Sequence, residues 1–253
     1  MALHLTYVGC EGVLVRSRGG SVLIDGLFGR EAEPFGVPRA SDMESLRHAR
    51  PPFQEIDVVL ATHDHGDHFD PGAVAAYLRA SPRTRFVSTP QAVGALRSVA
   101  DDDVVSRATA VEPVDGARRA LDIGPIRVEA FGLSHGRVHY AGVQHLAWMA
   151  TLDGRSVLHL GDGIIDEKSL RAAGVLDGSI DVGVFPFWFL TYPFGKRLVE
   201  KTFRPRSIFA VHIRVAEREQ VVSEIGAWID ATPLIEPLSR YEIGRDGRVS
   251  REE

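Results

Sequence analysis

The sequence predicts an α/β protein in which two mixed β-sheets pack together and helices cover their outer faces. Gly, Pro or Asp punctuates the chain roughly every ten to fifteen residues, which favours many short elements over long helices. Segments typical of strands occur in both halves of the chain, and each half ends in helices. No repeat or low-complexity segment interrupts this pattern, so we expect residues 1–253 to form a single domain.

The first half of the chain combines strands with two helices. The segment between Glu31 and Pro52 has mixed polarity, so we expect a long surface loop with one helical turn near Met43 to His48. Asp70-Pro71 provides an N-cap and a first-turn proline for a helix. The expected helices cover residues 73–79 and 91–100, and the expected strands cover residues 3–8, 12–16, 21–24, 56–61 and 85–88.

The second half of the chain begins with strands and then alternates. Asp153-Gly154 predicts a tight hairpin turn within a run of expected strands at residues 104–110, 118–122, 126–133, 147–152 and 156–160. Beyond residue 160, strands and helices follow one another, as in parallel sheets. The expected helices are 167–173, 196–203 and 217–229, and the expected strands are 180–185, 207–211 and 241–243.

Composition excludes several classes of protein. Of the 253 residues, 44% are hydrophobic and 25% charged, which is typical of a globular protein and not of a disordered one. The net charge of −5 gives no basic surface for nucleic acid, and no apolar run approaches the ~20 residues that span a bilayer. The first residues lack the pattern of a signal peptide, so we expect a cytoplasmic protein without a membrane partner.

The chain has one cysteine, Cys10, so it can form no internal disulfide. This fits a reducing compartment. We interpret Cys10 as a small buried residue that is not needed as a metal ligand.

A histidine-rich run, Thr62-His63-Asp64-His65-Gly66-Asp67-His68, follows the expected strand 56–61. In extended backbone, side chains two residues apart point the same way, so His63 and His65 converge while Asp64 points away. Gly66 permits a turn that brings Asp67 and His68 back to the same cavity. Imidazole and carboxylate ligands suit zinc, iron or manganese. The alternative is a polar surface loop that is merely rich in histidine.

The pattern His63-x-His65-x-Asp67-His68 resembles the signature of the metallo-β-lactamase superfamily. Four further segments follow in that family's order: Val22 to Gly26, Ser134 to Gly136, Leu158 to Asp162, and Ala210 to His212. The resemblance implies a four-layer αβ/βα sandwich of two mixed sheets with a metal site at their shared edge. The opening Tyr7 to Val15 looks most like the ascorbate-6-phosphate lactonase-like branch of metal-dependent hydrolases.

The resemblance also implies a ligand set for two metals. One metal would take His63, His65 and a third histidine, for which His135 has the expected strand-end position and His139 is the main rival. The second would take Asp67, His68 and a last histidine, which we expect to be His212. Asp162, between Gly161 and Gly163, would bridge them. The alternatives are a turn or N-cap aspartate at 162 and a helix-entry residue at 212.

Further residues are candidates for supporting the metals or the substrate. Asp25 is expected to accept a hydrogen bond from a ligand histidine or from the backbone of residues 62–65, although it could simply cap a turn. His139, Tyr140 and His145 are candidates for binding substrate. The aromatic segment 185–194, with Trp188 and Tyr192, is expected to form a pocket wall, a contact in a homo-oligomer or part of the core.

The function implied by the resemblance is a metal-dependent hydrolase that acts on a small molecule. Two divalent ions, Zn²⁺ first with Mn²⁺ or Fe as alternatives, would hold a bridging hydroxide that attacks an ester, lactone, amide or phosphoester. Asp67 would orient this nucleophile and move its proton. The competing hypotheses are a mononuclear iron dioxygenase acting on a thiol or persulfide and a non-catalytic metal-binding protein.

Overall fold

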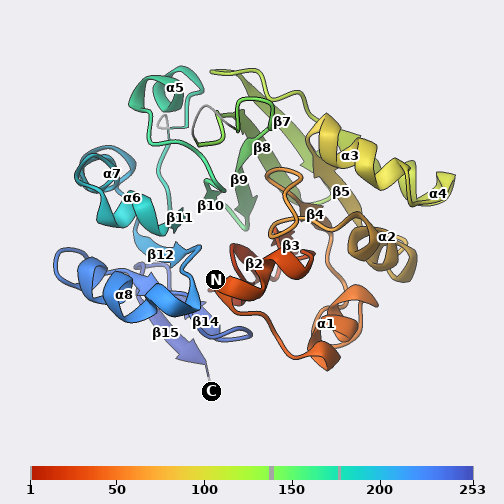
Figure 1. Cartoon of the computed structure of the whole chain (residues 1–253), viewed down its shortest axis with the longest axis horizontal. Coiled ribbons are helices and arrows are strands. Elements are labelled where there is room, and N and C mark those ends of the chain that lie inside the picture. Colours follow the sequence, from red (N-terminus) through yellow and green to blue (C-terminus); the bar gives the residue numbers. More distant parts are fainter. Residues whose placement is uncertain (1, 137–139, 176–177, 253) are drawn as a thin grey trace.

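The strands form two mixed sheets, as the sequence predicts (Figure 1). The computed structural model describes residues 2–136, 140–175 and 178–252. The first sheet has the order β15 (Val249–Glu252), β14 (Arg240–Ile243), β1 (Leu3–Gly9), β2 (Gly12–Ser17), β3 (Gly20–Ile24), β4 (Val58–Leu60), β5 (Arg85–Ser88) and β6 (Ala108–Ala110). The second has the order β13 (Thr232–Pro233), β12 (Ser207–Val211), β11 (Val182–Pro186), β10 (Arg155–His159), β9 (Leu146–Leu152), β8 (Ile126–Gly132) and β7 (Arg118–Ile123).

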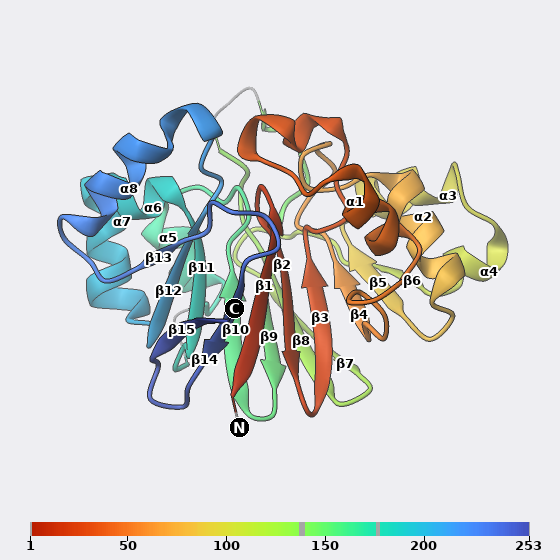
Figure 2. The same ribbon diagram turned by 90° about the horizontal axis from the view of Figure 1, so that it is seen from below.

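Helices cover the outer face of each sheet, which gives four layers (Figure 2). The first sheet is covered by α1 (Ala40–Arg47), α2 (Pro71–Ala80), α3 (Pro90–Arg97) and α4 (Asp102–Val105). The second is covered by α5 (Glu167–Ala172), α6 (Phe187–Thr191), α7 (Pro193–Leu198) and α8 (Arg218–Gly226). Shorter helical turns are η1 (Arg30–Phe35), η3 (Val199–Phe203) and η4 (Val215–Glu217).

The central strands are buried on both faces, and their alternate side chains belong to different cores, whereas the edge strands β6, β7 and β15 are largely exposed. In β3, Val22 and Ile24 face the core between the sheets, whereas Leu23 packs into the core under α1 to α4. This alternation follows from the two-residue period of a strand. The packing fixes which loops meet at each edge of the sandwich.

The carboxyl ends of several strands meet at one edge of the sandwich. β3 and β4 are parallel neighbours, and β1 runs the same way because β2 is antiparallel to both β1 and β3. In the second sheet β10, β11 and β12 are parallel, and β8 is aligned with them through the antiparallel β9. Loops that follow β1, β3, β4, β8, β10 and β12 therefore converge there, where ligands bind in α/β proteins.

The structure corrects the expected surface loop at residues 31–52. This segment contains η1 and α1, and Phe35, Met43 and Leu46 are buried in the outer core. The expected strand 104–110 is also too long. Its first residues form α4, capped by the Asp101 side chain, and only Ala108–Ala110 is a strand. Neither β13 nor β15, which extend the two sheets, was expected from the sequence.

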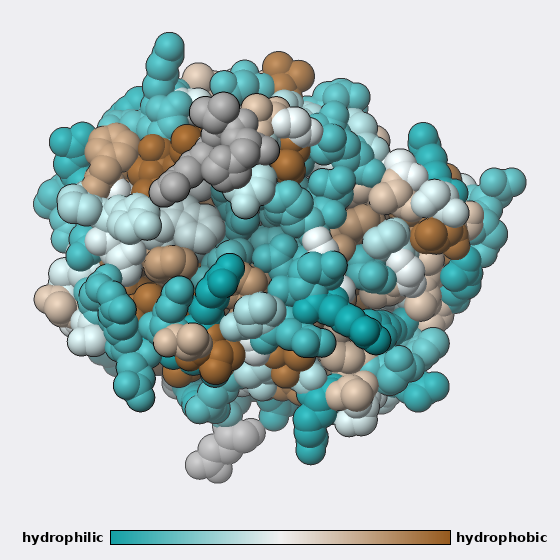
Figure 3. All heavy atoms as spheres, viewed as in Figure 1, coloured by the Kyte–Doolittle hydropathy of each residue, from teal (hydrophilic) through white to brown (hydrophobic). Residues whose placement is uncertain are grey.

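Within the described ranges, no helix has the length and apolar character needed to cross a bilayer. The face of the molecule seen in Figure 3 is mostly hydrophilic, and its hydrophobic side chains form small separate patches. This face therefore has no continuous apolar surface.

Candidate metal centre

Two groups of ligand-type side chains meet at the edge where the strand ends converge. The first cluster consists of His63 and His65 after β4, His135 after β8 and Asp162 after β10. Its donor atoms lie within 4.8 Å of one another. His63 Nε2 lies 2.9 Å from His65 Nδ1, and His135 Nε2 lies 3.3 Å from Asp162 Oδ2. Of the two rivals for the third histidine, the structure brings His135 into this cluster, whereas His139 lies outside the described residues.

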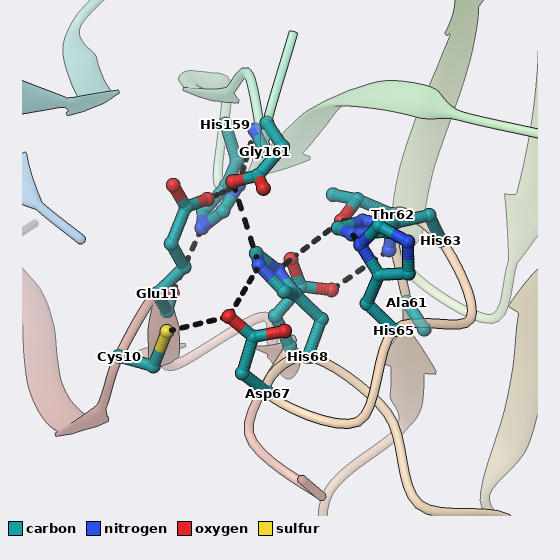
Figure 4. A network of polar contacts seen from close by, with 12 residues as sticks. Cys10, Glu11, Ala61, Thr62, His63, His65, Asp67, His68, His159 and Gly161 are labelled. Atoms are coloured by element: carbon teal, nitrogen blue, oxygen red, sulfur yellow. Dashed lines mark hydrogen bonds and ion pairs between the residues drawn. The ribbon is translucent and has the colours of Figure 1, made fainter. Parts of the chain in front are cut away.

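The second cluster contains Asp67, His68, His212 and Cys10. Asp67 Oδ2 lies 3.7 Å from His68 Nε2, 3.5 Å from His212 Nε2 and 3.8 Å from Cys10 Sγ. Figure 4 shows Cys10, Asp67 and His68 facing one another across this space. Asp64 is exposed and belongs to neither cluster, although it lies beyond the end of β4 at Leu60 and so outside the extended strand from which its direction was predicted.

Asp162 lies between the two clusters. Its Oδ1 is 3.4 Å from both His68 Nε2 and His212 Nε2, while its Oδ2 faces His135. Gly161 has a φ of +53°, and a Cβ there would lie 2.8 Å from Cβ of Thr62. The glycine therefore lets the β10 loop pass close to the β4 loop and present the carboxylate to both clusters.

The donor set fits divalent cations. Among the described residues, Nε2 of His68, of His135 and of His212 and Oδ1 of Asp162 are buried without a hydrogen-bond partner. Unpaired buried polar atoms are costly, and several that converge on one space are expected where a cation completes them. Imidazole and carboxylate are also the ligands that zinc, manganese and iron accept.

Asp25, which follows β3, contacts a histidine of each cluster, directly or through Thr62. One carboxylate oxygen accepts a hydrogen bond from His68 Nδ1 at 2.9 Å, which leaves His68 Nε2 to face the second cluster. The same carboxylate accepts bonds from the Thr62 amide and hydroxyl, both at 2.7 Å. Thr62 Oγ1 in turn lies 3.0 Å from His63 Nδ1. The hydroxyl can therefore accept a hydrogen bond from Nδ1–H of His63 while it donates its own hydrogen bond to Asp25.

Burial and charge set the protonation of these groups. Burial lowers the pKa of His63 well below its usual value, so this imidazole is neutral and ready to bind a cation. Burial also opposes the charge on His68 and on Asp162, but the two lie close together. The charge of Asp162 raises the pKa of His68, and the charges of His212 and His68 lower the pKa of Asp162. A positive charge is thus favoured beside Asp162.

The remaining described histidines have other surroundings. His159 is fully buried, and its Nε2 donates to the Glu11 carbonyl at 2.9 Å while its Nδ1 accepts from the Gly161 amide. His145 is buried behind the first cluster, with its ring 5.4 Å from that of His63, so it does not line the aromatic cavity described next. His4 and His48 are exposed and lie outside both metal clusters.

A cavity of about 520 Å³ opens beside the first cluster. Tyr140, Trp188 and Tyr192 form its aromatic part, Ile164 and Ile165 its aliphatic part, and it reaches His135 and Asp162. The aromatic segment expected at 185–194 thus supplies part of the wall from α6 and its C-terminal end. A hollow of about 700 Å³ lies at the amino ends of β3, β4 and β5, but none of the clustered residues lines it.

Sequence reasoning missed two residues of this edge. Cys10 and Glu11 form the two-residue connection between β1 and β2. Glu11 is fully buried, and its carboxylate lies within 4.8 Å of donor atoms of His68 and Asp162. The available signal was the order of strands: once β1 is known to run parallel to β3, its end must lie beside Asp25.

Comparison with known proteins agrees with this geometry. A family model described as "Beta-lactamase superfamily domain" matches residues 4–187. The chain belongs to the metallo-β-lactamase superfamily. The "Probable L-ascorbate-6-phosphate lactonase UlaG" of Shigella boydii and of Escherichia coli are both 32% identical to this member of the superfamily. In each case the match covers 29% of this chain and 26% of the relative, so the chain spans about a quarter of these curated relatives.

Solved structures share the fold over the whole chain. A metallo hydrolase from Ignicoccus hospitalis, Igni18, is 18% identical with a TM-score of 0.65, over 100% of this chain and 99% of its own. The isothiocyanate hydrolase from Delia radicum gut bacteria is 15% identical with a TM-score of 0.58, over 98% of each chain. CmlA, a diiron β-hydroxylase from Streptomyces venezuelae, is 16% identical with a TM-score of 0.62, over 99% of this chain and 54% of its own. At these identities the likeness concerns the fold alone.

Proposed function

We propose that this protein is a hydrolase that depends on two divalent metal ions and acts on a small molecule. The observation that carries the proposal is the position of Asp162, whose two carboxylate oxygens face different clusters of buried imidazoles. His63, His65 and His135 would hold one cation, Asp67, His68 and His212 the other, and Asp162 would contact both. We propose zinc as the metal because imidazole-rich sites suit it, with manganese or iron as the alternatives.

The chemistry of the proposal is divided between metal and protein. When bound, such cations polarise a carbonyl or phosphoryl oxygen and lower the pKa of water to about 7. Asp67 is the protein group that we propose moves the proton. Burial acts to raise the pKa of Asp67, but His212 and His68 lower it below its usual value, so the carboxylate is ionised at neutral pH. It can then orient the attacking water and carry a proton to the leaving group.

The aromatic cavity suggests the kind of substrate. Tyr140, Trp188 and Tyr192 offer ring faces next to His135 and Asp162, which suits an ester, lactone, amide or phosphoester with a ring or apolar portion. His145 is 1% exposed but lines a neighbouring cavity of about 490 Å³ together with His135 and Tyr140, so our proposal keeps it as a candidate for binding substrate.

The names of the relatives favour hydrolysis. The curated relatives are named as lactonases and two of the structural relatives as hydrolases, whereas CmlA is named as a diiron β-hydroxylase. We propose a cytoplasmic location because the single buried cysteine suits a reducing compartment.

Metal content and activity of the purified protein test the proposal together. We expect two zinc or manganese ions per chain and turnover of at least one member of a panel of aryl esters, lactones, phosphodiesters and thioesters. His63→Ala should lose metal and reduce activity at least 100-fold, roughly 3 kcal/mol in transition-state stabilisation. His48→Ala changes an exposed histidine outside both metal clusters and is the matched control.

Three results would contradict the proposal. One iron per chain with oxygen consumption and no hydrolysis would support an iron dioxygenase. A protein that binds no metal tightly would support neither enzyme. Full activity and full metal content in His63→Ala would show that the first cluster is not the reaction centre.

A further inference from the structure

Cys10 is placed against the second cluster by the turn between β1 and β2. It is the only cysteine in the chain, and its side chain is fully buried. Its backbone carbonyl accepts a hydrogen bond of 3.1 Å from the His212 amide, so the two residues are held together. Both have left-handed backbone, with φ of 51° at Cys10 and 60° at His212. Such conformations cost free energy for residues other than glycine, so the surrounding structure must hold both residues in place.

The spacing of donor atoms in the second cluster matches one coordination sphere. Cys10 Sγ lies 3.8 Å from Asp67 Oδ2, which lies 3.7 Å from His68 Nε2 and 3.5 Å from His212 Nε2. Donors about 2.1–2.3 Å from one zinc ion lie roughly 3.0–3.6 Å apart for angles between about 90° and 109° at the metal, a range that leaves room for Asp162 as a further ligand. The three distances from Asp67 Oδ2 lie near the upper end of this range, and all four donor atoms lie within 4.8 Å of one another.

His68 gives independent evidence that a ligand belongs in this space. Its side chain has no exposed surface, and its Nδ1 is held by Asp25. Its Nε2 has no hydrogen-bond partner among the described residues and lies within 4.8 Å of Cys10 Sγ. The thiol thus faces a buried nitrogen that has no hydrogen-bond partner among the described residues.

We propose that Cys10 is a thiolate ligand of the second metal ion, alongside Asp67, His68 and His212. The inference rests on the metal centre of the proposed function and adds a sulfur ligand to it. The thiol would release its proton to solvent when the cation binds, since only the thiolate coordinates a metal.

A sulfur ligand makes the two clusters chemically different. The first cluster has only nitrogen and oxygen donors, whereas the second would have a soft thiolate. Soft ligands favour zinc over manganese or magnesium. The second site should therefore keep zinc in the presence of excess Mn²⁺, and the first should exchange more readily.

The alternative role for Cys10 is packing with a weak S–H contact to Asp67, which requires no bond between sulfur and metal. Cobalt substitution separates the two roles, because a thiolate bound to Co²⁺ gives a near-ultraviolet charge-transfer band that nitrogen and oxygen ligands do not give. No other cysteine can produce this band. We would load the metal-free protein with Co²⁺ to saturation and compare wild type, Cys10→Ala and His65→Ala, which removes a ligand of the other cluster.

We expect the charge-transfer band in wild type and in His65→Ala and its absence in Cys10→Ala. Zinc affinity at one of the two sites should fall at least about tenfold in Cys10→Ala. Wild-type protein that binds cobalt, seen by its visible bands, without the charge-transfer band would overturn the role of Cys10 and leave the hydrolase proposal intact. Failure to bind cobalt at all would overturn both.

X-ray absorption of the zinc-loaded wild type gives a second readout that needs no variant. We expect a sulfur scatterer at about 2.3 Å, at an average of half a sulfur per zinc when both sites are filled. A zinc environment with only nitrogen and oxygen neighbours would refute the assignment, whether or not Cys10→Ala folds.

Discussion

At the scale of single residues, Asp25 is connected to both metal clusters without being a proposed metal ligand itself. It fixes His68 directly and reaches His63 through the hydroxyl of Thr62, so one buried carboxylate supports a histidine of each cluster. Such partners fix the tautomer and orientation of metal-binding imidazoles. We interpret Asp25 as a positioning residue for both clusters.

Asp25→Asn and Thr62→Val test this position as a pair. Asp25→Asn removes the negative acceptor for His68 and weakens the link to His63, so metal affinity should fall about 10–100-fold at both sites. Thr62→Val removes the hydroxyl that joins Asp25 to His63 but leaves the direct bond between Asp25 and His68, so the larger loss should fall on one site. A calorimetric titration of each metal-free variant with zinc measures the affinities of the two sites. Equal losses at both sites in Thr62→Val would contradict this division.

His145 should make the stability of the metal-free protein depend on pH. Burial lowers the pKa of His145 from 6.5 to about 3, and neither ring nitrogen has a hydrogen-bond partner among the described residues. Below pH 6.5 the unfolded chain therefore binds a proton that the folded protein refuses. The free energy of unfolding should fall as the pH drops from 6.5 toward 3, by at most about 1.4 kcal/mol per pH unit from this group.

His145→Leu removes this group and keeps the site apolar. The variant should show a shallower loss of stability between pH 6.5 and 4, measured by urea unfolding at a series of pH values in the presence of chelator. His48→Leu, which makes the same substitution at an exposed histidine outside both clusters, is measured beside it for comparison. An unchanged slope in His145→Leu would show that this histidine is protonated in the folded protein.

At the scale of elements, the loop after β10 sets the distance between the two sheets at the site. Gly161 has left-handed backbone, and a Cβ there would lie 2.7 Å from both His145 Nε2 and Thr62 Cγ2. The loop can pass the β4 loop only without a side chain. Asp162 reaches both clusters because of this close approach.

Gly161→Ala should destabilise the protein and lower its metal content. The left-handed backbone alone costs about 1–2 kcal/mol for alanine, and the clash adds about 1–3 kcal/mol. Gly154→Ala, in the hairpin turn between β9 and β10, has a φ of +73° and no neighbour within 4 Å of the added Cβ, so it carries only the first cost. Denaturant unfolding and metal analysis of both variants give the comparison. If Gly161→Ala were no more destabilised than Gly154→Ala and kept its full metal content, the close approach of the β10 loop to the β4 loop would not be needed for metal binding.

The elements that the sequence predicted well have a strong local signal. β1, β2, β3 and β12 are apolar or alternating runs with turns on both sides, and their observed bounds differ from expectation by no more than a residue. The prediction of a surface loop at residues 31–52 was wrong because Pro34, Gly36 and Pro38 are typical of loops. Burial of Phe35 and Leu46 instead stabilises two short helices there. Tertiary contact thus overrode local propensity there.

At the scale of the whole molecule, metal binding should stabilise the folded protein. The proposed histidine and aspartate ligands come from four strand ends in two sheets, so the unfolded chain cannot present the site. At a free metal concentration 100 times Kd, one site adds about 2.7 kcal/mol, or roughly 5–10 °C in Tm for a chain of this size. Chelator should lower the Tm of the wild type by at least that amount, since two sites are emptied, and by much less in Asp162→Ala. No effect of chelator on wild type would argue against a bound cation.

The single domain remains a prediction. Strands from both halves of the chain share the core between the sheets, for example Val15 and Ile24 with Trp148 and Val184. If residues 1–253 form one domain, metal-free protein should unfold in a single calorimetric transition whose calorimetric and van't Hoff enthalpies agree. Two transitions would indicate that the two sheets unfold separately.

The sequence alone determined the two-sheet α/β architecture and the histidine-rich run, because strand periodicity and ligand spacing are local properties. It also indicated His135, Asp162 and His212 as partners of that run, through the order of motifs along the chain. Asp25 was likewise expected to accept a hydrogen bond from a ligand histidine or from the backbone of residues 62–65, and it accepts both, from His68 and from the Thr62 amide. Only the tertiary structure showed that the histidine is His68, that the Thr62 hydroxyl links Asp25 to His63, and that Cys10 and Glu11 lie beside the second cluster. These contacts join loops more than 30 residues apart, and their geometry depends on strand order and on close approaches that no local pattern encodes.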